Sequence, residues 1–141
     1  MKQRYFLMAL SAILLVQGCW HAYEYSPNQV FDKNSKLDLN AKNLELLYAN
    51  PADDTITIAF VGDSQRFYDE LQQFIDTVNS IPSIDFVLLA GDISDFGLLS
   101  EFELIQNMLS QLNKPYIGVV GNHDLVAKGE EVYERMFGPL N

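Results

Sequence analysis

The chain has 141 residues, a formal net charge of −10 at pH 7 and a single cysteine. One cysteine excludes an internal disulfide. The acidic balance argues against binding to a nucleic-acid backbone and provides no basic face for anionic lipid, so we expect no nucleic-acid partner.

The amino terminus has the pattern of a secretory signal peptide over residues 1–18. Lys2 and Arg4 precede an apolar stretch, residues 5–16, that is too short to cross a bilayer comfortably. The sequence Val-Gln-Gly-Cys that ends at Cys19 resembles a bacterial lipobox. We therefore expect a lipid anchor on Cys19 that holds the protein in the bacterial cell envelope, facing the periplasm or the exterior. The alternative is an ordinary buried cysteine in an uncleaved helix.

Residues 19–51 are expected to form a lipidated spacer that ends in a short helix over residues 41–48. In that helix Leu44, Leu47 and Tyr48 could pack on the core of the domain that follows. Aromatic side chains of the spacer are expected to dock on the domain, with carbohydrate binding as the alternative: Tyr23, Tyr25 and Phe31.

The rest of the chain, residues 52–141, predicts a β-α-β-α-β unit of the α/β class. The apolar runs at residues 55–61, 86–90 and 116–120 are typical of strands with both faces buried. Helical spacing of apolar residues predicts helices at three places, 67–79, 98–112 and 129–137. In the second of these, Ser100 and Glu103 have the spacing of a capping box.

Each predicted strand is followed directly by a glycine and then by polar residues that suit a metal site. Right-handed crossovers place the three strand ends at one sheet edge, where open α/β sheets bind ligands. The segments are Gly62-Asp63-Ser64-Gln65, Gly91-Asp92-Ile93-Ser94-Asp95 and Gly121-Asn122-His123-Asp124. Asp63 and Asp92 are oxygen donors for divalent cations, Asn122 and Gln65 add amide oxygens, and His123 suits a ligand or a general acid. The glycines would permit close approach of a cation or phosphate to the backbone. Ordinary turns are the alternative for any one segment, but three at matched strand ends favour the metal site.

These motifs resemble those of the calcineurin-like metallophosphoesterases: Asp-x-His, Gly-Asp-x-x-Asp and Gly-Asn-His-(Asp/Glu), in this order. The resemblance implies half of an αββα sandwich, incomplete at its carboxyl end, and hydrolysis of a small phosphorylated substrate with two divalent metal ions. By the same resemblance Asp63 would bind one metal ion, Asp92 would bridge the two and Asn122 would bind the other. His123 would contact the phosphate and protonate the leaving oxygen, Asp124 would hold its imidazole by a hydrogen bond, and Asp95 would support the ligands from behind.

One departure from the family pattern lies at Gln65, where the family usually has histidine. An amide oxygen would favour Mn²⁺ or Mg²⁺ over Zn²⁺, although Mn, Fe, Zn and Mg all remain candidates. The alternative is that Gln65 only hydrogen-bonds a metal-bound water. The neighbouring Arg66 would either clamp a phosphate oxygen or serve as an ordinary surface charge.

A second departure is the absence of the family's later metal-binding histidines. The chain contains only His21 and His123. We therefore expect the amino-terminal half of a phosphoesterase, from a truncated gene or a partial sequence, which binds metals weakly by itself. The alternative is a noncatalytic envelope lipoprotein with a degenerate phosphoesterase fold. A flavodoxin-like or nucleotide-binding module is disfavoured because no glycine-rich phosphate loop follows the first strand.

Overall fold

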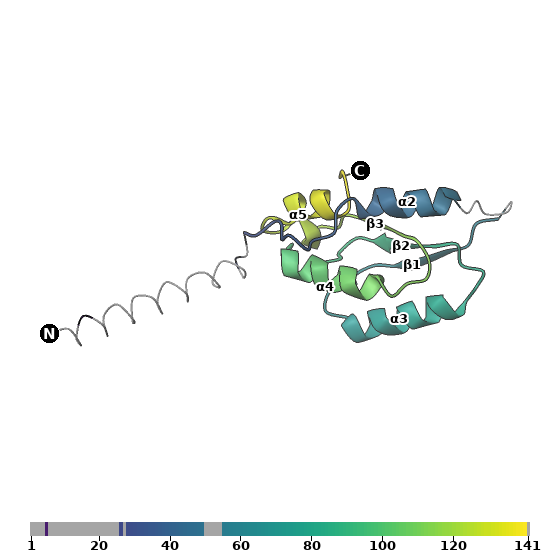
Figure 1. The fold of residues 1–141 in the computed structure, drawn as a ribbon. Helices are drawn as coiled ribbons and strands as arrows, with labels where there is room; N and C mark the ends of the chain where they lie inside the picture. The colour runs from purple at the N-terminus through teal and green to yellow at the C-terminus, as the bar shows by residue number, and fades with distance from the viewer. Residues whose placement is uncertain (1–4, 6–25, 27, 50–54, 141) are drawn as a thin grey trace.

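The computed structural model describes residues 5, 26, 28–49 and 55–140 (Figure 1). The predicted lipobox and Cys19 lie outside these residues, as does the predicted signal peptide except for Tyr5. In the part of the chain that is described, no helix has the length and apolar character needed to span a bilayer.

The predicted alternation of strands and helices is confirmed. In chain order the elements are α2 (Leu39–Ala49), β1 (Ile58–Val61), α3 (Tyr68–Ser80), β2 (Phe86–Ala90), α4 (Leu99–Leu109), β3 (Tyr116–Val119), the 3₁₀ turn η1 (His123–Leu125) and α5 (Gly129–Met136). Each helix and strand other than η1, which was not predicted, lies within a few residues of its expected range. The fold class is therefore α/β, consistent with part of a metallophosphoesterase domain.

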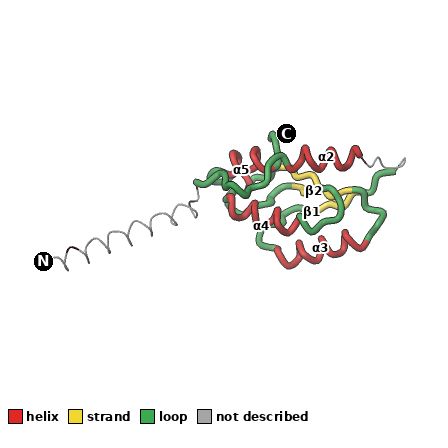
Figure 2. The backbone as a smooth tube through the Cα atoms, in the orientation of Figure 1, coloured by secondary structure: helices red, strands yellow, loops and turns green. Residues whose placement is uncertain are grey.

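The three strands form one parallel sheet in the order β1-β2-β3. Phe60 pairs with Leu88, and Leu88 with Ile117. Figure 1 shows the strands side by side and running in one direction, with α2 beyond β3 and α3 beyond β1 in this view, and Figure 2 shows the same arrangement with the strands in yellow. All three carboxyl ends therefore meet at one edge, as the sequence predicts.

The core lies between one face of this sheet and helices α3, α4 and α5. Val87 and Leu89 of β2 are buried there with Ile75 of α3 and Phe102 of α4. The ring of Tyr133 stacks on that of Phe137, with centroids 5.2 Å apart. This layer fixes the direction in which the three strand ends point.

Two buried tyrosines remain protonated in this core at neutral pH. Burial raises the pKa of Tyr116 to about 12, against a smaller lowering by its hydrogen bond with Gln106. Burial also raises the pKa of Tyr133. The Tyr133 hydroxyl donates to the carbonyl oxygen of Gly118 at 2.7 Å, so the phenol serves as a donor to the backbone of β3.

The amino terminus of α4 is stabilised by Glu101 rather than by the predicted pair of Ser100 and Glu103. The Glu101 carboxylate accepts the backbone N–H groups of Phe96 at 2.9 Å and Leu98 at 3.2 Å. Ser100 is already inside the helix, whose N-cap is Leu98, so the predicted capping box is wrong by two residues. Glu103 instead accepts the hydroxyl of Ser35 at 2.6 Å.

Helix α2 lies along the free edge of β3 and replaces a neighbouring strand. The Asn40 amide donates to the carbonyl of Gly118 and accepts its N–H, both at 2.8 Å. The Asn43 side chain accepts the N–H of Tyr116 at 3.0 Å. These bonds satisfy backbone groups that would otherwise be left unpaired at a sheet edge. The spacer and the domain are therefore in direct contact.

The residues by which α2 docks differ from those expected. Leu39 and Asn43 are buried, whereas Leu44 is 37 % exposed and Tyr48 77 % exposed. The prediction that Leu44 and Tyr48 pack on the core is wrong, because an edge strand requires hydrogen-bond partners and the helix turns its amides toward it.

Replacing Asn40 with alanine tests this edge contact. Asn40→Ala leaves the N–H and carbonyl of Gly118 without these partners, and we expect it to lower the free energy of unfolding by about 1–3 kcal/mol. Glu45→Ala, at an exposed position of the same helix, is the control and should change it by less than about 0.5 kcal/mol. Urea unfolding followed by circular dichroism measures both, and equal stability of the two variants would contradict the contact.

The opposite face of the sheet is open among the described residues. Ile58 is 38 % exposed, Phe60 61 % and Val119 39 %. The prediction that both strand faces are buried is thus wrong for the described part of the chain, because its helices cover one face only. The continuous apolar character of the strands fits a sheet that is covered on both faces.

Candidate active site

Backbone and side-chain hydrogen bonds tie the three strand-end loops together around Asp92. The N–H of Gln65 donates to the Asp92 carbonyl at 3.3 Å. The N–H of His123 donates to Asp92 Oδ1 at 3.0 Å. Asp92 therefore links the loop after β1 to the loop after β3, as a central ligand in a shared site would.

Four non-glycine residues of these loops have left-handed backbone conformations. Their φ angles are +48° at Asp63, +64° at Arg66, +51° at Asp92 and +49° at Ala127. Such conformations cost non-glycine residues about 1–2 kcal/mol each. Backbone strain of this kind, found here in all three loops at one sheet edge, is typical of functional sites.

Glycine is required at two of the three strand ends. A Cβ on Gly121 would lie 2.2 Å from Asp92 Oδ1. Gly91 has a φ of +86°, and a Cβ added to it would lie 3.0 Å from the Cα of Gly121. By contrast, a Cβ on Gly62 would meet its nearest atom at an ordinary 3.5 Å. The close packing of the loops therefore requires glycine at Gly91 and Gly121 but not at Gly62, and the approach of a cation or phosphate to these glycines stays a prediction.

The predicted metal donors have oxygens free for a cation. Within the described residues, the side chains of Asp63 and Asn122 make no hydrogen bond, and Asp92 uses only Oδ1. The Oε1 atom of Gln65 is buried and has no partner there. An unpaired buried acceptor costs about 1–3 kcal/mol, and a bound cation would remove that cost. The donors therefore fit a hard divalent metal ion.

Two of these four donors are carboxylates, from Asp63 and Asp92, and two are amides, from Gln65 and Asn122. The described residues contain no group of three or more His, Cys, Asp or Glu side chains arranged to hold a metal ion. A metal bound here by this chain would depend on the amide oxygens of Gln65 and Asn122.

The imidazole of His123 is held by a backbone carbonyl. Its Nδ1 lies 3.0 Å from the carbonyl oxygen of Asp95, so Nδ1 carries the proton and donates. This tautomer leaves Nε2 as the ring nitrogen available to a substrate. The predicted hydrogen bond from Asp124 to the imidazole is not present, because both Asp124 oxygens have other partners.

Asp124 is fully buried and joins two of the loops. Its Oδ1 accepts the N–H of Ser94 at 2.7 Å and the Ser94 hydroxyl at 2.9 Å, and its Oδ2 accepts the N–H of Gly121 at 2.8 Å. Ser94 was not among the predicted site residues. The only feature of the sequence that points to a role for Ser94 in the site is its position within the second motif.

Arg66 is held against the second loop by two contacts. Its Nε lies 2.5 Å from Asp95 Oδ1. The guanidinium carbon also lies 5.7 Å from the ring centroid of Phe96. The contact of Phe96 with Arg66 could not be predicted from the sequence, since an exposed aromatic residue next to a motif does not by itself indicate a partner.

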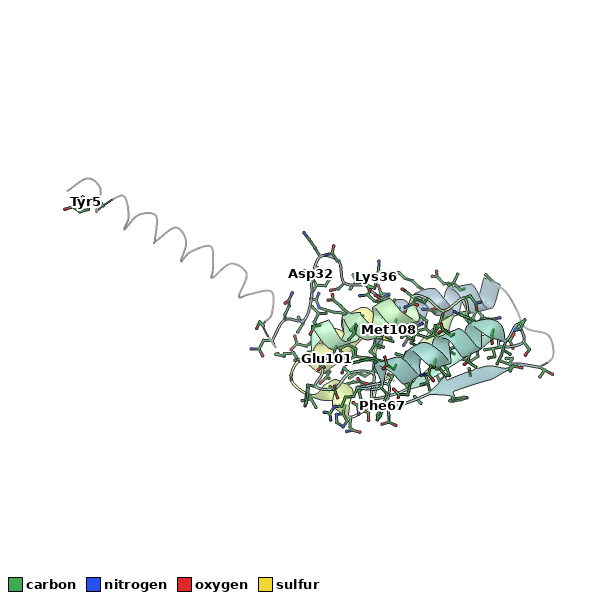
Figure 3. The ribbon with its side chains drawn as sticks, turned by 90° about the horizontal axis from the view of Figure 1, so that it is seen from below. Tyr5, Asp32, Lys36, Phe67, Glu101 and Met108 are labelled. Carbon is green, nitrogen blue, oxygen red and sulfur yellow. The ribbon has the colours of Figure 1, made fainter. Side chains whose placement is uncertain are left out.

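A hollow of about 280 Å³ adjoins Asp63 and extends to Phe67 and Glu70. Figure 3 places Phe67 at the start of α3. A larger hollow of about 530 Å³ lies at the amino ends of the strands, near Ile84 and Pro115, and contains none of the predicted site residues.

Residues 56–140, more than half of the chain, match the family model of the calcineurin-like phosphoesterases. The chain belongs to this family. Calcineurin-like phosphoesterases typically use divalent metal ions, and the match includes all three loops described above.

Individual relatives match over shorter segments. A symmetrical bis(5'-nucleosyl)-tetraphosphatase of Mannheimia succiniciproducens is 41 % identical over 66 residues, which are 47 % of this chain and 23 % of the relative. The corresponding enzyme of Nitrosococcus oceani is 39 % identical over 70 residues, 50 % of this chain and 24 % of the relative. A probable cyclic nucleotide phosphodiesterase of Xenorhabdus bovienii is 29 % identical over 58 residues, 41 % and 24 % respectively. The phosphoesterase chain thus spans about a quarter of the length of these relatives. No solved structure gives a significant match.

Proposed function

We propose that this protein is a metal-dependent hydrolase of phosphoester bonds. The observation that carries the proposal is the unpaired, buried Oε1 of Gln65, at the same sheet edge as the free oxygens of Asp63, Asp92 and Asn122. The names of its relatives favour small phosphorylated molecules, nucleotides among them, over polymers.

The donors divide between two proposed divalent ions around Asp92. Asp63 and Gln65 would serve one ion, Asn122 the other, and Asp92 both. Divalent ions held there would withdraw charge from the phosphoryl oxygens and activate the attacking water. Of Mn, Fe, Zn and Mg, these all-oxygen donors favour Mn²⁺ or Mg²⁺.

The proposed general acid is His123. Its Nδ1 proton is committed to the Asp95 carbonyl, so the imidazolium form of His123 would donate its Nε2 proton to the departing oxygen and leave the neutral ring protonated at Nδ1. Asp124 contributes by fixing the loops: it binds Ser94 and Gly121 and so sets the position from which η1 presents His123.

A lipid anchor on Cys19 is the second part of the proposal. The signal peptide over residues 1–18 and the lipobox support a protein tethered to the bacterial envelope, facing the periplasm or the exterior. Mass spectrometry of Cys19 tests this: a diacylglyceryl mass supports it, and an unmodified, uncleaved amino terminus contradicts it.

A noncatalytic envelope protein is the other candidate function. It is favoured by Gln65, which stands where the family usually has a histidine ligand.

The deciding experiment measures Mn²⁺ content and Mn²⁺-dependent hydrolysis of a mono-aryl and a bis-aryl phosphate. It uses the 141-residue chain and any longer protein encoded in its reading frame. Activity in either supports the hydrolase, and the preferred ester separates monoesterase from diesterase. Absence of metal and of activity in both would support the noncatalytic protein.

A further inference from the structure

We propose that Arg66 binds a non-bridging oxygen of the substrate phosphate, and that Asp95 positions Arg66 and His123 together. This inference rests on the proposed hydrolase function and extends it to the residue that recognises the phosphate anion.

The first argument is the way in which Arg66 is held. Its backbone is in the left-handed region, with φ +64°, and its side chain is 62 % exposed. An arginine with only a solvent-facing role would not need such a conformation. The strain is offset by the bond from Nε to Asp95 and by the contact with Phe96, which together fix one orientation of the guanidinium.

The second argument is what these contacts leave free. Among the described residues, only Nε of the Arg66 guanidinium has a hydrogen-bond partner. The two terminal NH₂ groups remain for a ligand, and their planar arrangement matches two oxygens of a phosphate. Arg66 is also the only lysine or arginine within the three loops, residues 62–67, 91–98 and 121–127. It is therefore the one full positive charge that this part of the chain offers to an anion.

The third argument is the double role of Asp95. The carboxylate of this buried residue holds Arg66 at 2.5 Å, and its carbonyl oxygen holds the His123 imidazole at 3.0 Å. A phosphate ester whose departing oxygen faces His123 would thus lie beside a guanidinium that is fixed to the same residue. Asp95 acts as a positioning residue for both groups.

The test measures the affinity for inorganic phosphate, at saturating Mg²⁺, by isothermal titration calorimetry. It uses the active form identified by the hydrolysis assay above, or the 141-residue chain where neither form is active. We expect Arg66→Ala to weaken phosphate binding at least about 10-fold, the loss of one charge-assisted contact. Arg66→Lys should recover part of it. Arg66→Gly, which relieves the left-handed backbone, replaces Arg66→Ala if that variant does not fold.

Arg135→Ala is the matched control. Arg135 is likewise exposed and lies 5.3 Å from the ring centroid of a phenylalanine, Phe31, but it belongs to α5 and not to the three loops. It should leave phosphate affinity unchanged within about 2-fold. A direct readout is the Nε–H resonance of Arg66, which should shift on addition of phosphate while that of Arg135 does not.

A double-mutant cycle separates positioning from a general structural role. Asp95→Asn should weaken phosphate binding in the parent and have little further effect in Arg66→Ala, because the Asp95 side chain acts through Arg66. If the parent binds phosphate and Arg66→Ala binds it equally well, Arg66 is a surface ion pair and this inference fails alone. If the parent binds no phosphate with Mg²⁺ present, the proposed function fails together with it.

Discussion

Asp92→Asn should abolish metal-dependent hydrolysis while leaving the fold intact. The amide keeps an oxygen that can accept the N–H of His123, as Asp92 Oδ1 does at 3.0 Å, so the link between the loops survives. It loses the charge that two cations would share. Mutating residues that hydrogen-bond to metal ligands typically lowers metal affinity or activity 10–100-fold. Loss of the central ligand itself should therefore lower kcat/KM more than about 100-fold.

Direct measurement of Mn²⁺ binding by equilibrium dialysis should show the same loss. Asp69→Asn, which changes an exposed carboxylate in the first turn of α3, is the matched control and should bind Mn²⁺ as the parent does. Hydrolysis by Asp92→Asn at near the parent rate would remove the basis for the metal-centred site.

Much of this site could be predicted because its signals are local in sequence. Asp63, Asp92 and Asn122 each follow an apolar run, and the parallel topology then brings them to one edge. The ranges of the strands and helices could also be predicted, because apolar runs and helical spacing are likewise local in sequence. What the sequence predicts well is therefore the identity of the residues at the strand ends.

The partners of those residues could not be predicted, because they depend on contacts between loops. Asp124 sits next to His123 in the chain, yet it binds Ser94, thirty residues earlier. The imidazole takes a backbone carbonyl, which any residue type at position 95 would offer. Likewise the docking of Asn40 on β3 depends on backbone groups, which leave no pattern of apolar residues.

The two glycines that open the first and third motifs should respond in opposite ways to alanine. In Gly121→Ala the new Cβ would lie 2.1 Å from the backbone nitrogen of Asp92 and 2.2 Å from its Oδ1. Neither atom can yield without moving Asp92, so we expect a loss of about 1–3 kcal/mol or more in the free energy of unfolding and loss of Mn²⁺ binding.

Gly62→Ala is the control because its new Cβ would lie 3.5 Å from the nearest atom, in ordinary contact with Ala90. The reduced freedom of the unfolded chain should then leave stability unchanged or raise it by about 0.4–1 kcal/mol. Thermal unfolding and Mn²⁺ dialysis of both variants make the comparison. Equal tolerance at the two positions would show that Asp92 is not packed against Gly121, and equal damage would show that Gly62 is as crowded as Gly121. The expected asymmetry would establish that the site is built on the close approach of the loops after β2 and β3, with the loop after β1 joining them through its side chains and the hydrogen bond from Gln65.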